Sequence, residues 1–224
     1  MNALSGLSGR RLDIVESSDP EIFRRPVFAH FRVGRNGDPV SKCRAFAHVI
    51  DSGVGKRVDI ALFKFCYVDI TAQTDVNGLF DAYQGVMDSL SEHYPKVMFL
   101  HVTVPLRRVG RGVLGWLREK SGSFDRERED QARRHAFNQL LRGGYGRSGR
   151  FFDLAEAEAT FPDGTPSYVH YRGEQVPNLV SEYTHDGGHL SRQAAERIAG
   201  RLLACLSVTG AASGSSGERQ GHSR

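Results

Sequence analysis

An almost uninterrupted apolar run most restricts the folds open to this chain. Residues 58–68 read VDIALFKFCYV, where β-branched, aromatic and other apolar side chains fill nearly every position. A strand with one face in water would alternate polar and apolar residues, so this run predicts a strand buried on both faces, as in a parallel sheet. Further strands are expected over residues 12–16, 97–104 and 151–154.

Segments with helical periodicity separate these strands. We expect helices over residues 41–50, 79–93 and 125–141, and a last one after Ser191, its predicted N-cap. The last helix carries an apolar residue at every fourth position: Leu190, Ala194, Ile198, Leu202 and Leu206. Residues 17–32 and 161–183 read as irregular connections. Strands that alternate with helices predict an α/β fold, with helices on both faces of a parallel sheet.

Composition narrows the function classes. Charged residues make up 25% and hydrophobic residues 39%, as in an ordinary globular protein. The net charge is +4, but the densest basic cluster, residues 126–134, also contains acidic residues, so we interpret it as a solvated helix face and expect no nucleic-acid partner. No apolar run approaches the roughly 20 residues of a membrane span.

The two ends of the chain and its cysteines suggest one cytoplasmic domain. Residues 1–206 are expected to fold, and the Ser/Gly-rich residues 207–224 to form a disordered tail. The first residues have no signal-peptide pattern, so the chain as written is expected in the cytoplasm. Cys43, Cys66 and Cys205 are widely spaced, which favours free thiols over a disulfide framework.

A polar segment before the last helix is the clearest candidate for chemistry. Asp186 and His189 are separated by Gly187 and Gly188, which permit a tight turn that returns the carboxylate towards the imidazole. A carboxylate that orients an imidazole is the Asp–His half of a hydrolase triad. Polar turns that cap helices have the same composition, so the residues alone leave both interpretations open.

Three stretches resemble the SGNH (GDSL-type) hydrolases, in particular a bacterial branch of that superfamily. They are GRNGDPVSK at residues 34–42, KFCYVD at residues 64–69 and YTHDGGHL at residues 183–190. The resemblance implies a flavodoxin-like, three-layer sheet of order 2-1-3-4-5 and a serine ester hydrolase that works through an acyl-enzyme, without metal or organic cofactor. It implies that His189 is the base and Asp186 the carboxylate that orients it.

The same resemblance suggests substrate-binding roles near the first two stretches. Gly37 matches a glycine whose N–H helps to form the oxyanion hole, although an Asn-Gly turn would look the same. Asp69 matches the Asp of the family's G-x-N-D block, but Val68 stands where that block has its Asn donor. Lys64 interrupts the apolar strand, and because a buried ammonium is costly unless paired, we expect it to meet Asp69, Asp38 or a substrate group.

The family's nucleophile has no counterpart in the chain. In this branch the serine block ends the first strand and directly precedes a segment like residues 2–7. Ser5 and Ser8 have no strand ahead of them to hold them rigidly. We therefore expect a sheet without its first strand, either because the start codon was assigned too far downstream or because the protein is non-catalytic. A missing N-terminus would also remove any export signal, which leaves the location open.

The sequence thus predicts a serine ester hydrolase whose substrate is a small-molecule or glycan ester. The alternative is a non-catalytic SGNH-fold protein that binds a glycan or an acyl ligand. A Gly-rich insertion over residues 106–124, which contains Trp116, either borders the substrate pocket or forms a surface loop. Metal-dependent hydrolysis through His185, Asp186 and His189 is disfavoured because their spacing matches no zinc signature.

Overall fold

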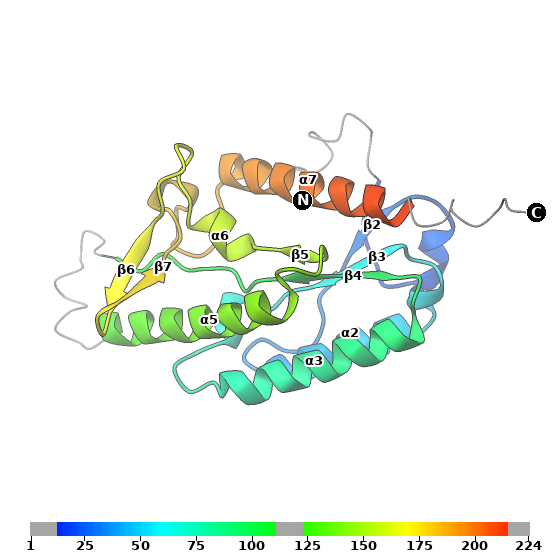
Figure 1. Cartoon of the computed structure of the whole chain (residues 1–224), viewed down its shortest axis with the longest axis horizontal. Helices are drawn as coiled ribbons and strands as arrows, with labels where there is room; N and C mark the ends of the chain where they lie inside the picture. The colour runs from blue at the N-terminus through cyan, green and yellow to red at the C-terminus, as the bar shows by residue number, and fades with distance from the viewer. Residues whose placement is uncertain (1–12, 111–122, 215–224) are drawn as a thin grey trace, which may run out of the picture.

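The computed structural model describes residues 13–110 and 123–214, which form an α/β fold. Parallel strands lie in the middle, α2, α3 and α5 lie on one side, and α6 and α7 lie on the other (Figure 1). The predicted fold class is confirmed. In chain order the elements are β1 (Ile14–Glu16), η1 (Pro20–Arg24), β2 (Phe28–His30), α2 (Pro39–Asp51), η2 (Val54–Lys56), β3 (Ile60–Phe63), η3 (Tyr67–Asp69), α3 (Val76–His93), β4 (Met98–Val102), α5 (Ser123–Tyr145), β5 (Phe151–Phe152), α6 (Leu154–Glu158), β6 (Tyr168–Tyr171), β7 (Glu174–Pro177), η4 (Ser181–Tyr183) and α7 (Arg192–Gly214).

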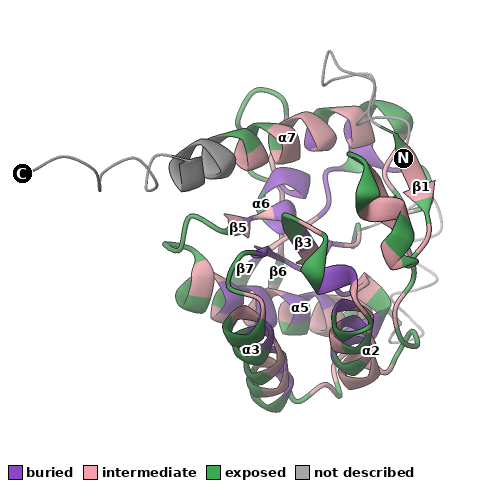
Figure 2. Cartoon of the chain, turned by 90° about the vertical axis from the view of Figure 1, so that its right-hand side faces the viewer, coloured by how far each residue is buried: buried purple, intermediate pink, exposed green. Residues whose placement is uncertain are grey.

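The parallel strands belong to two separate sheets. One has the order β3-β4-β5, and in the other β1 pairs with β2. In Figure 2, β1 lies on the opposite side of β3 from β5. Among the described residues no strand pairs with the edge of β3 that faces away from β4, and Ile60 of β3 is 39% exposed. The sheet is therefore open where the order 2-1-3-4-5 would place its first strand.

Strand β4 is buried on both faces, as a central parallel strand should be. Phe99 packs edge-to-face on Phe46 of α2, within the core on the side of α2 and α3. The next residue, Leu100, points to the other face and belongs to the cluster that contains Ile198 of α7. Successive side chains of the strand therefore join two cores, one for each helical layer.

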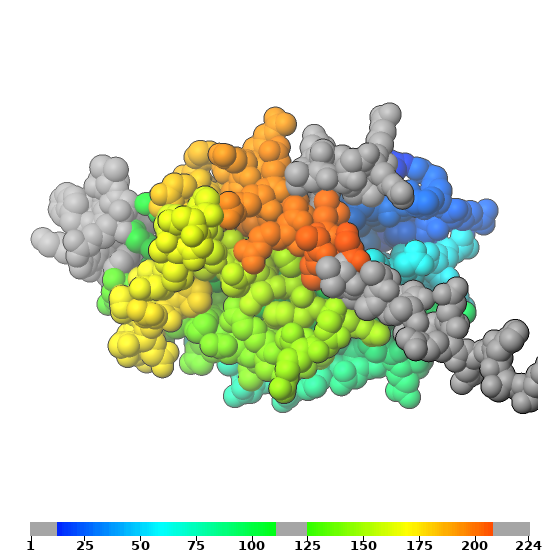
Figure 3. All heavy atoms as spheres, turned by 45° about the horizontal axis from the view of Figure 1, so that its top comes forward, coloured from blue at the N-terminus to red at the C-terminus, as the bar shows by residue number. Residues whose placement is uncertain are grey.

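The apolar stripe predicted for the last helix is confirmed. Ser191 caps the helix, since its Oγ accepts the N–H of Ala194 at 3.4 Å, and Ala194 and Ile198 are buried. Figure 3 shows α7, in orange, lying across residues of the yellow-green segment that contains α6. The helix continues to Gly214, beyond Leu206, where we expected the domain to end. Residues 215–224 of the expected tail lie outside the described residues.

Three local expectations about secondary structure are wrong. Residues 17–32 contain η1 and β2, and residues 161–183 contain the β6–β7 hairpin and η4. The hairpin turns at Arg172 and Gly173, which both have positive φ, although Arg-Gly is not a usual signal for this turn. Of residues 58–68 only β3 is a strand, because the chain turns into η3 soon after it, and β3 is not buried on both faces as predicted, since only Ala61 and Phe63 are buried.

Some expected features lie outside the described residues or concern single side chains. Ser5, Ser8 and Trp116 fall in the segments that the structure does not describe. Cys43 is a buried thiol whose pKa burial raises to about 12, and among the described residues none of Cys43, Cys66 and Cys205 is in a disulfide. No helix in the described ranges combines the length and apolar character that a membrane span needs.

A buried carboxyl group in α6 makes the stability of the fold depend on pH. Burial raises the pKa of Glu158 to about 7, although the Leu106 N–H that it accepts at 2.6 Å and the charge of Lys64 oppose the shift. Because the folded pKa lies above the unfolded one, the neutral form stabilises the fold fully below about pH 4.5. This contribution disappears as the pH rises through 7.

We expect Glu158→Gln to raise the free energy of unfolding at pH 8 by about 2–3 kcal/mol and to change it little at pH 4.5. Gln keeps an oxygen for the Leu106 N–H but carries no charge. Urea unfolding at both pH values measures the effect. Glu92→Gln, at an exposed position of α3, should show no such pH dependence. An equal effect of Glu158→Gln at both pH values would contradict the prediction.

Candidate active site

The loop that carries Asp186 and His189 is held in shape by its own contacts. An antiparallel bridge between Thr184 and Leu190 closes it. Gly187 has φ +83°, a conformation that suits glycine, and its N–H donates to the Thr184 hydroxyl at 2.9 Å. The loop therefore presents its two polar side chains in a fixed relation.

The Asp186 carboxylate binds the His189 ring and the loop backbone at once. Its Oδ2 lies 2.6 Å from His189 Nδ1, and its Oδ1 accepts the N–H groups of Gly188 and His189, each at 2.8 Å. Thr184 also donates its hydroxyl to Oδ1, at 3.2 Å. The backbone N–H of His189, its ring and the N–H of Gly188 hold the pKa of Asp186 far below its ordinary value. The carboxylate is thus ionised at neutral pH.

An ionised carboxylate on Nδ1 decides what the ring can do. It keeps the proton of the neutral imidazole on Nδ1, which leaves a lone pair on Nε2. The His189 side chain is 79% exposed, and among the described residues its Nε2 has no hydrogen-bond partner. The ring is therefore able to accept a proton from a hydroxyl that approaches from solvent.

Tyr67 connects this loop to the end of β3. Its ring meets the His189 ring edge-on, with centroids 6.2 Å apart. A Cβ on Gly188 would lie 2.8 Å from the Tyr67 hydroxyl oxygen, so only glycine fits at position 188 without a shift. Since Tyr67 begins η3, shortly after β3, the His189 ring lies near the carboxyl end of the parallel sheet, where ligands bind in such folds.

A buried carboxylate joins η3 to the loop before α2, residues 34–38, which we call the glycine loop. Asp69 Oδ1 accepts the Gly37 N–H at 3.0 Å, and its Oδ2 accepts the Cys66 N–H and the Lys42 ammonium, each at 2.7 Å. Lys42 also donates to Asn36 Oδ1 at 2.8 Å. The N–H of Gly37, which we expected at an oxyanion hole, is therefore occupied by Asp69. Asp69 therefore holds the loop in place through these three hydrogen bonds.

Lys64 pairs with neither Asp69 nor Asp38, two of the three partners that we expected, and its contact with a substrate group stays a prediction. Its side chain is exposed, and it acts electrostatically on Glu158 instead of meeting Asp69 or Asp38. Asp38 is the N-cap of α2, where its Oδ1 accepts a backbone N–H, and it also binds Arg35. The lysine paired with Asp69 is Lys42, in the first turn of α2.

The sequence did contain a signal for Lys42. It lies four residues before Phe46 and eight before Ile50, on the apolar stripe of α2, and all three side chains are buried. A lysine on a buried stripe needs a counter-ion. The same reasoning that we applied to Lys64 points more strongly to Lys42.

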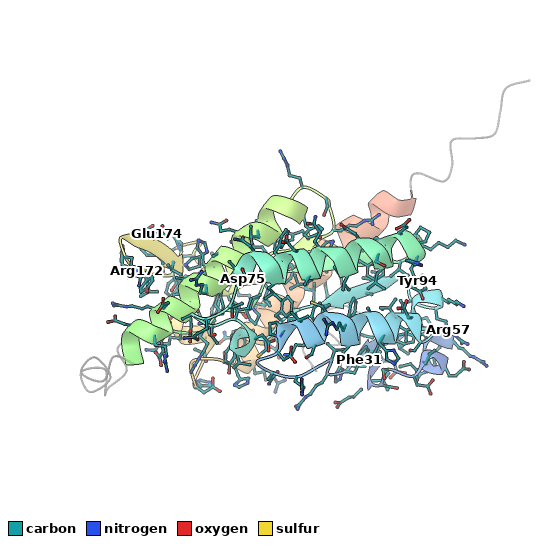
Figure 4. The ribbon with its side chains drawn as sticks, turned by 90° about the horizontal axis from the view of Figure 1, so that it is seen from below. Phe31, Arg57, Asp75, Tyr94, Arg172 and Glu174 are labelled. Atoms are coloured by element: carbon teal, nitrogen blue, oxygen red, sulfur yellow. The ribbon has the colours of Figure 1, made fainter. Side chains whose placement is uncertain are left out.

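A cavity of about 460 Å³ lies beside η3. Figure 4 shows α2 and α3 side by side, with Asp75 at the start of α3, and the cavity lies at the N-terminal ends of these two helices. Val40, Val68 and Leu79 give it an apolar lining, next to Gly37 and Asp69. Val68 therefore presents an apolar surface to this cavity.

Among the described residues, no three or more His, Cys, Asp or Glu side chains are arranged so that they could hold a metal ion together. The residues brought together are instead a His–Asp pair, a tyrosine and a buried Lys–Asp pair. Arg107 and Arg134, which sequence reasoning missed, also contact Tyr67.

Comparisons with known proteins add little beyond the fold. No family model matches the chain, and no curated protein matches it. A solved structure described as "a putative platelet activating factor from Streptococcus pneumonia" is similar to it, with 18% sequence identity over 87% of this chain and 82% of that chain and a TM-score of 0.49. A likeness at this level carries no argument about function, which must come from the geometry of the site.

Proposed function

We propose that the protein is a serine ester hydrolase of the SGNH type, in which His189 is the general base and Asp186 orients it. The observation that carries the proposal is the 2.6 Å contact between Asp186 Oδ2 and His189 Nδ1, with Nε2 left free and exposed. The resemblance of three sequence stretches to SGNH hydrolases supports it. The position of the pair near the carboxyl end of the sheet supports it as well.

The proposed reaction runs through an acyl-enzyme. His189 Nε2 takes the proton of a serine hydroxyl as its oxygen attacks the ester carbonyl carbon. The imidazolium, stabilised by Asp186, then gives this proton to the leaving alkoxide, and the ester C–O bond breaks. In the second half a water molecule loses a proton to Nε2 and attacks the acyl-enzyme, and the serine oxygen leaves with that proton.

The open edge of β3 suggests where the serine belongs. A parallel strand added there would end at the same edge of the sheet as η3, which contacts His189 through Tyr67. A serine at the end of that strand would be held rigidly near Nε2. We therefore propose that a strand outside the described residues supplies the nucleophile, and that the cavity beside Val68 accepts an apolar part of the ester.

A non-catalytic protein that binds a glycan or an acyl ligand is the second candidate. One observation favours it: the Gly37 N–H, the expected oxyanion donor, is bonded to Asp69. A binding protein needs no such donor and no nucleophile. The intact Asp186–His189 pair argues against it, because ligand binding alone does not require an imidazole with a fixed tautomer.

Hydrolysis of a short-chain aryl ester separates the two candidates. The 224-residue chain is compared with a version extended upstream by the in-frame genomic sequence before Met1, which the proposal expects to encode a strand and a serine. We expect turnover by the extended protein, and covalent labelling of its serine by an organophosphorus reagent, which requires a serine activated by its base. A folded extended protein that neither hydrolyses the ester nor reacts would exclude the hydrolase. A stop codon just upstream of Met1, with no strand encoded between the two, would exclude the hydrolase as well.

A further inference from the structure

A guanidinium without a counter-ion lies beside the candidate active site. Arg107 follows β4, and its Cζ is 5.4 Å from the centroid of the Tyr67 ring, which in turn meets the His189 ring. Its Nε is buried and has no hydrogen-bond partner in the part of the chain that the structure describes. Within residues 13–110 and 123–214, Arg107 forms no ion pair. A buried donor without a partner is costly, so this group favours an acceptor that comes from a ligand.

A second guanidinium adds positive charge at the same place. Arg134 is buried and donates to the backbone oxygens of Tyr67 and Ile70, which are neutral acceptors. Burial lowers the pKa of Arg134 to about 10; the charge of Asp130 opposes this shift, and the charge of Arg107 adds to it. The two arginines therefore repel each other, and an anion near Arg107 would relieve that repulsion.

The position of Arg107 relative to His189 is fixed by the backbone. The next residue, Arg108, donates its N–H to Gly187 O at 2.9 Å, and this hydrogen bond joins the segment to the loop that carries Asp186 and His189. The N–H of Arg107 itself donates to Gln131 Oε1 at 3.3 Å. These hydrogen bonds hold the Arg107 backbone next to the loop of His189. Tyr67 contacts both side chains, so all three residues belong to the folded site.

We propose that Arg107 determines substrate specificity by binding an anionic group, a carboxylate or a phosphate, on the ester that the serine activated by His189 attacks. This inference rests on the proposed function. A guanidinium binds either anion through paired hydrogen bonds, and the Tyr67 face behind it holds it in place. Asp186 does not compete for Arg107, since its two oxygens are already bonded to the His189 ring and to the loop.

The test measures binding to the 224-residue chain, without turnover. The chemical shift of the His189 ring is followed while three probes are added at constant pH: monomethyl succinate, monomethyl phosphate and the uncharged dimethyl succinate. We expect one or both anions to bind at least about tenfold more tightly than dimethyl succinate. Arg107→Gln should remove this preference, while Arg107→Lys should keep part of it. The stronger of the two anionic probes identifies the anion.

Arg108→Gln is the matched control, because Arg108 is exposed, has the same charge and is attached to the same loop. It should change anion affinity by less than about twofold. Equal affinity for charged and uncharged probes, an unchanged preference in a folded Arg107→Gln variant, or an equal loss in Arg108→Gln would each overturn the inference. If Arg107→Gln does not fold, the preference for anions in the parent chain and its decrease in Arg107→Lys decide the question.

The two proposals fail separately. Ester hydrolysis by the extended protein without any preference for anions would leave the hydrolase standing and remove the role of Arg107. Arg107-dependent anion binding in a protein that never hydrolyses esters would remove the hydrolase, and with it the statement that the anion belongs to an ester.

Discussion

Replacing His189 by Ala in the extended protein is expected to lower kcat for a short-chain aryl ester by about 10⁶-fold, to the level of the protein without its nucleophile. The imidazole is the group that takes and returns the proton in both halves of the proposed reaction. It is exposed and packs edge-on against Tyr67, so its removal should not disturb the fold. Initial rates at saturating ester, with circular dichroism to confirm folding, measure the effect.

Two further variants make this prediction specific. Asp186→Asn should cost about 10⁴-fold in kcat, because an amide nitrogen facing Nδ1 would favour the tautomer whose proton is on Nε2. His185→Ala is the matched control, since His185 is exposed in the same loop, and it should leave kcat unchanged. A His189→Ala variant that keeps a hundredth or more of the activity would contradict the assignment. Loss of activity in His185→Ala would instead reopen the metal-dependent alternative.

Replacing Lys42 by Met is expected to lower the free energy of unfolding by about 3–5 kcal/mol. The substitution leaves the Asp69 carboxylate buried without its counter-ion, because the Lys42 and Asp69 side chains are 8% and 0% exposed. Met fills a similar volume, so the loss would report on charge and hydrogen bonding more than on packing. Urea unfolding followed by circular dichroism measures it.

Lys56→Met serves as the control, because Lys56 is exposed, and it should change stability by no more than about 0.5 kcal/mol. The double variant Lys42→Met/Asp69→Asn should lose less free energy of unfolding than the two single variants added together. Each single change leaves the other side chain buried without its partner. A cost below about 1 kcal/mol for Lys42→Met, or strict additivity in the double variant, would show that the pair does not hold the glycine loop.

Long elements with clear periodicity and the short strands β1 and β5 could be predicted from the sequence, whereas β2 and the β6–β7 hairpin could not. The helices α2, α3, α5 and α7 and the strands β3 and β4 occur where residue spacing placed them, because each buries one stripe or both faces. The strand β2 has three residues, too few to show a period, and it forms because β1 lies beside it. The β6–β7 hairpin was missed because its turn uses Arg172 with φ +49°, which residue type does not indicate.

The site shows the same division between local and distant contacts. Asp186 and His189 are three residues apart, so their pairing follows from a turn that two glycines indicate. Asp69 binds Gly37 and Lys42, which lie in a different element, and only the packing of α2 against the end of β3 brings them together. The nearest lysine in the chain is Lys64, which sequence reasoning chose for this pair, but its side chain points elsewhere.

The short, open β3 strand carries an acidic residue, Asp59, immediately before it and Lys64 immediately after it, and both are exposed. Unpaired strand edges are where chains join into β-aggregates, and charged residues at the ends of such an edge oppose that association. While that edge is unpaired, Lys64 would act as a gatekeeper, and in the extended protein the proposed strand would cover the edge. Neutralising both flanking charges should make the protein precipitate at lower concentration.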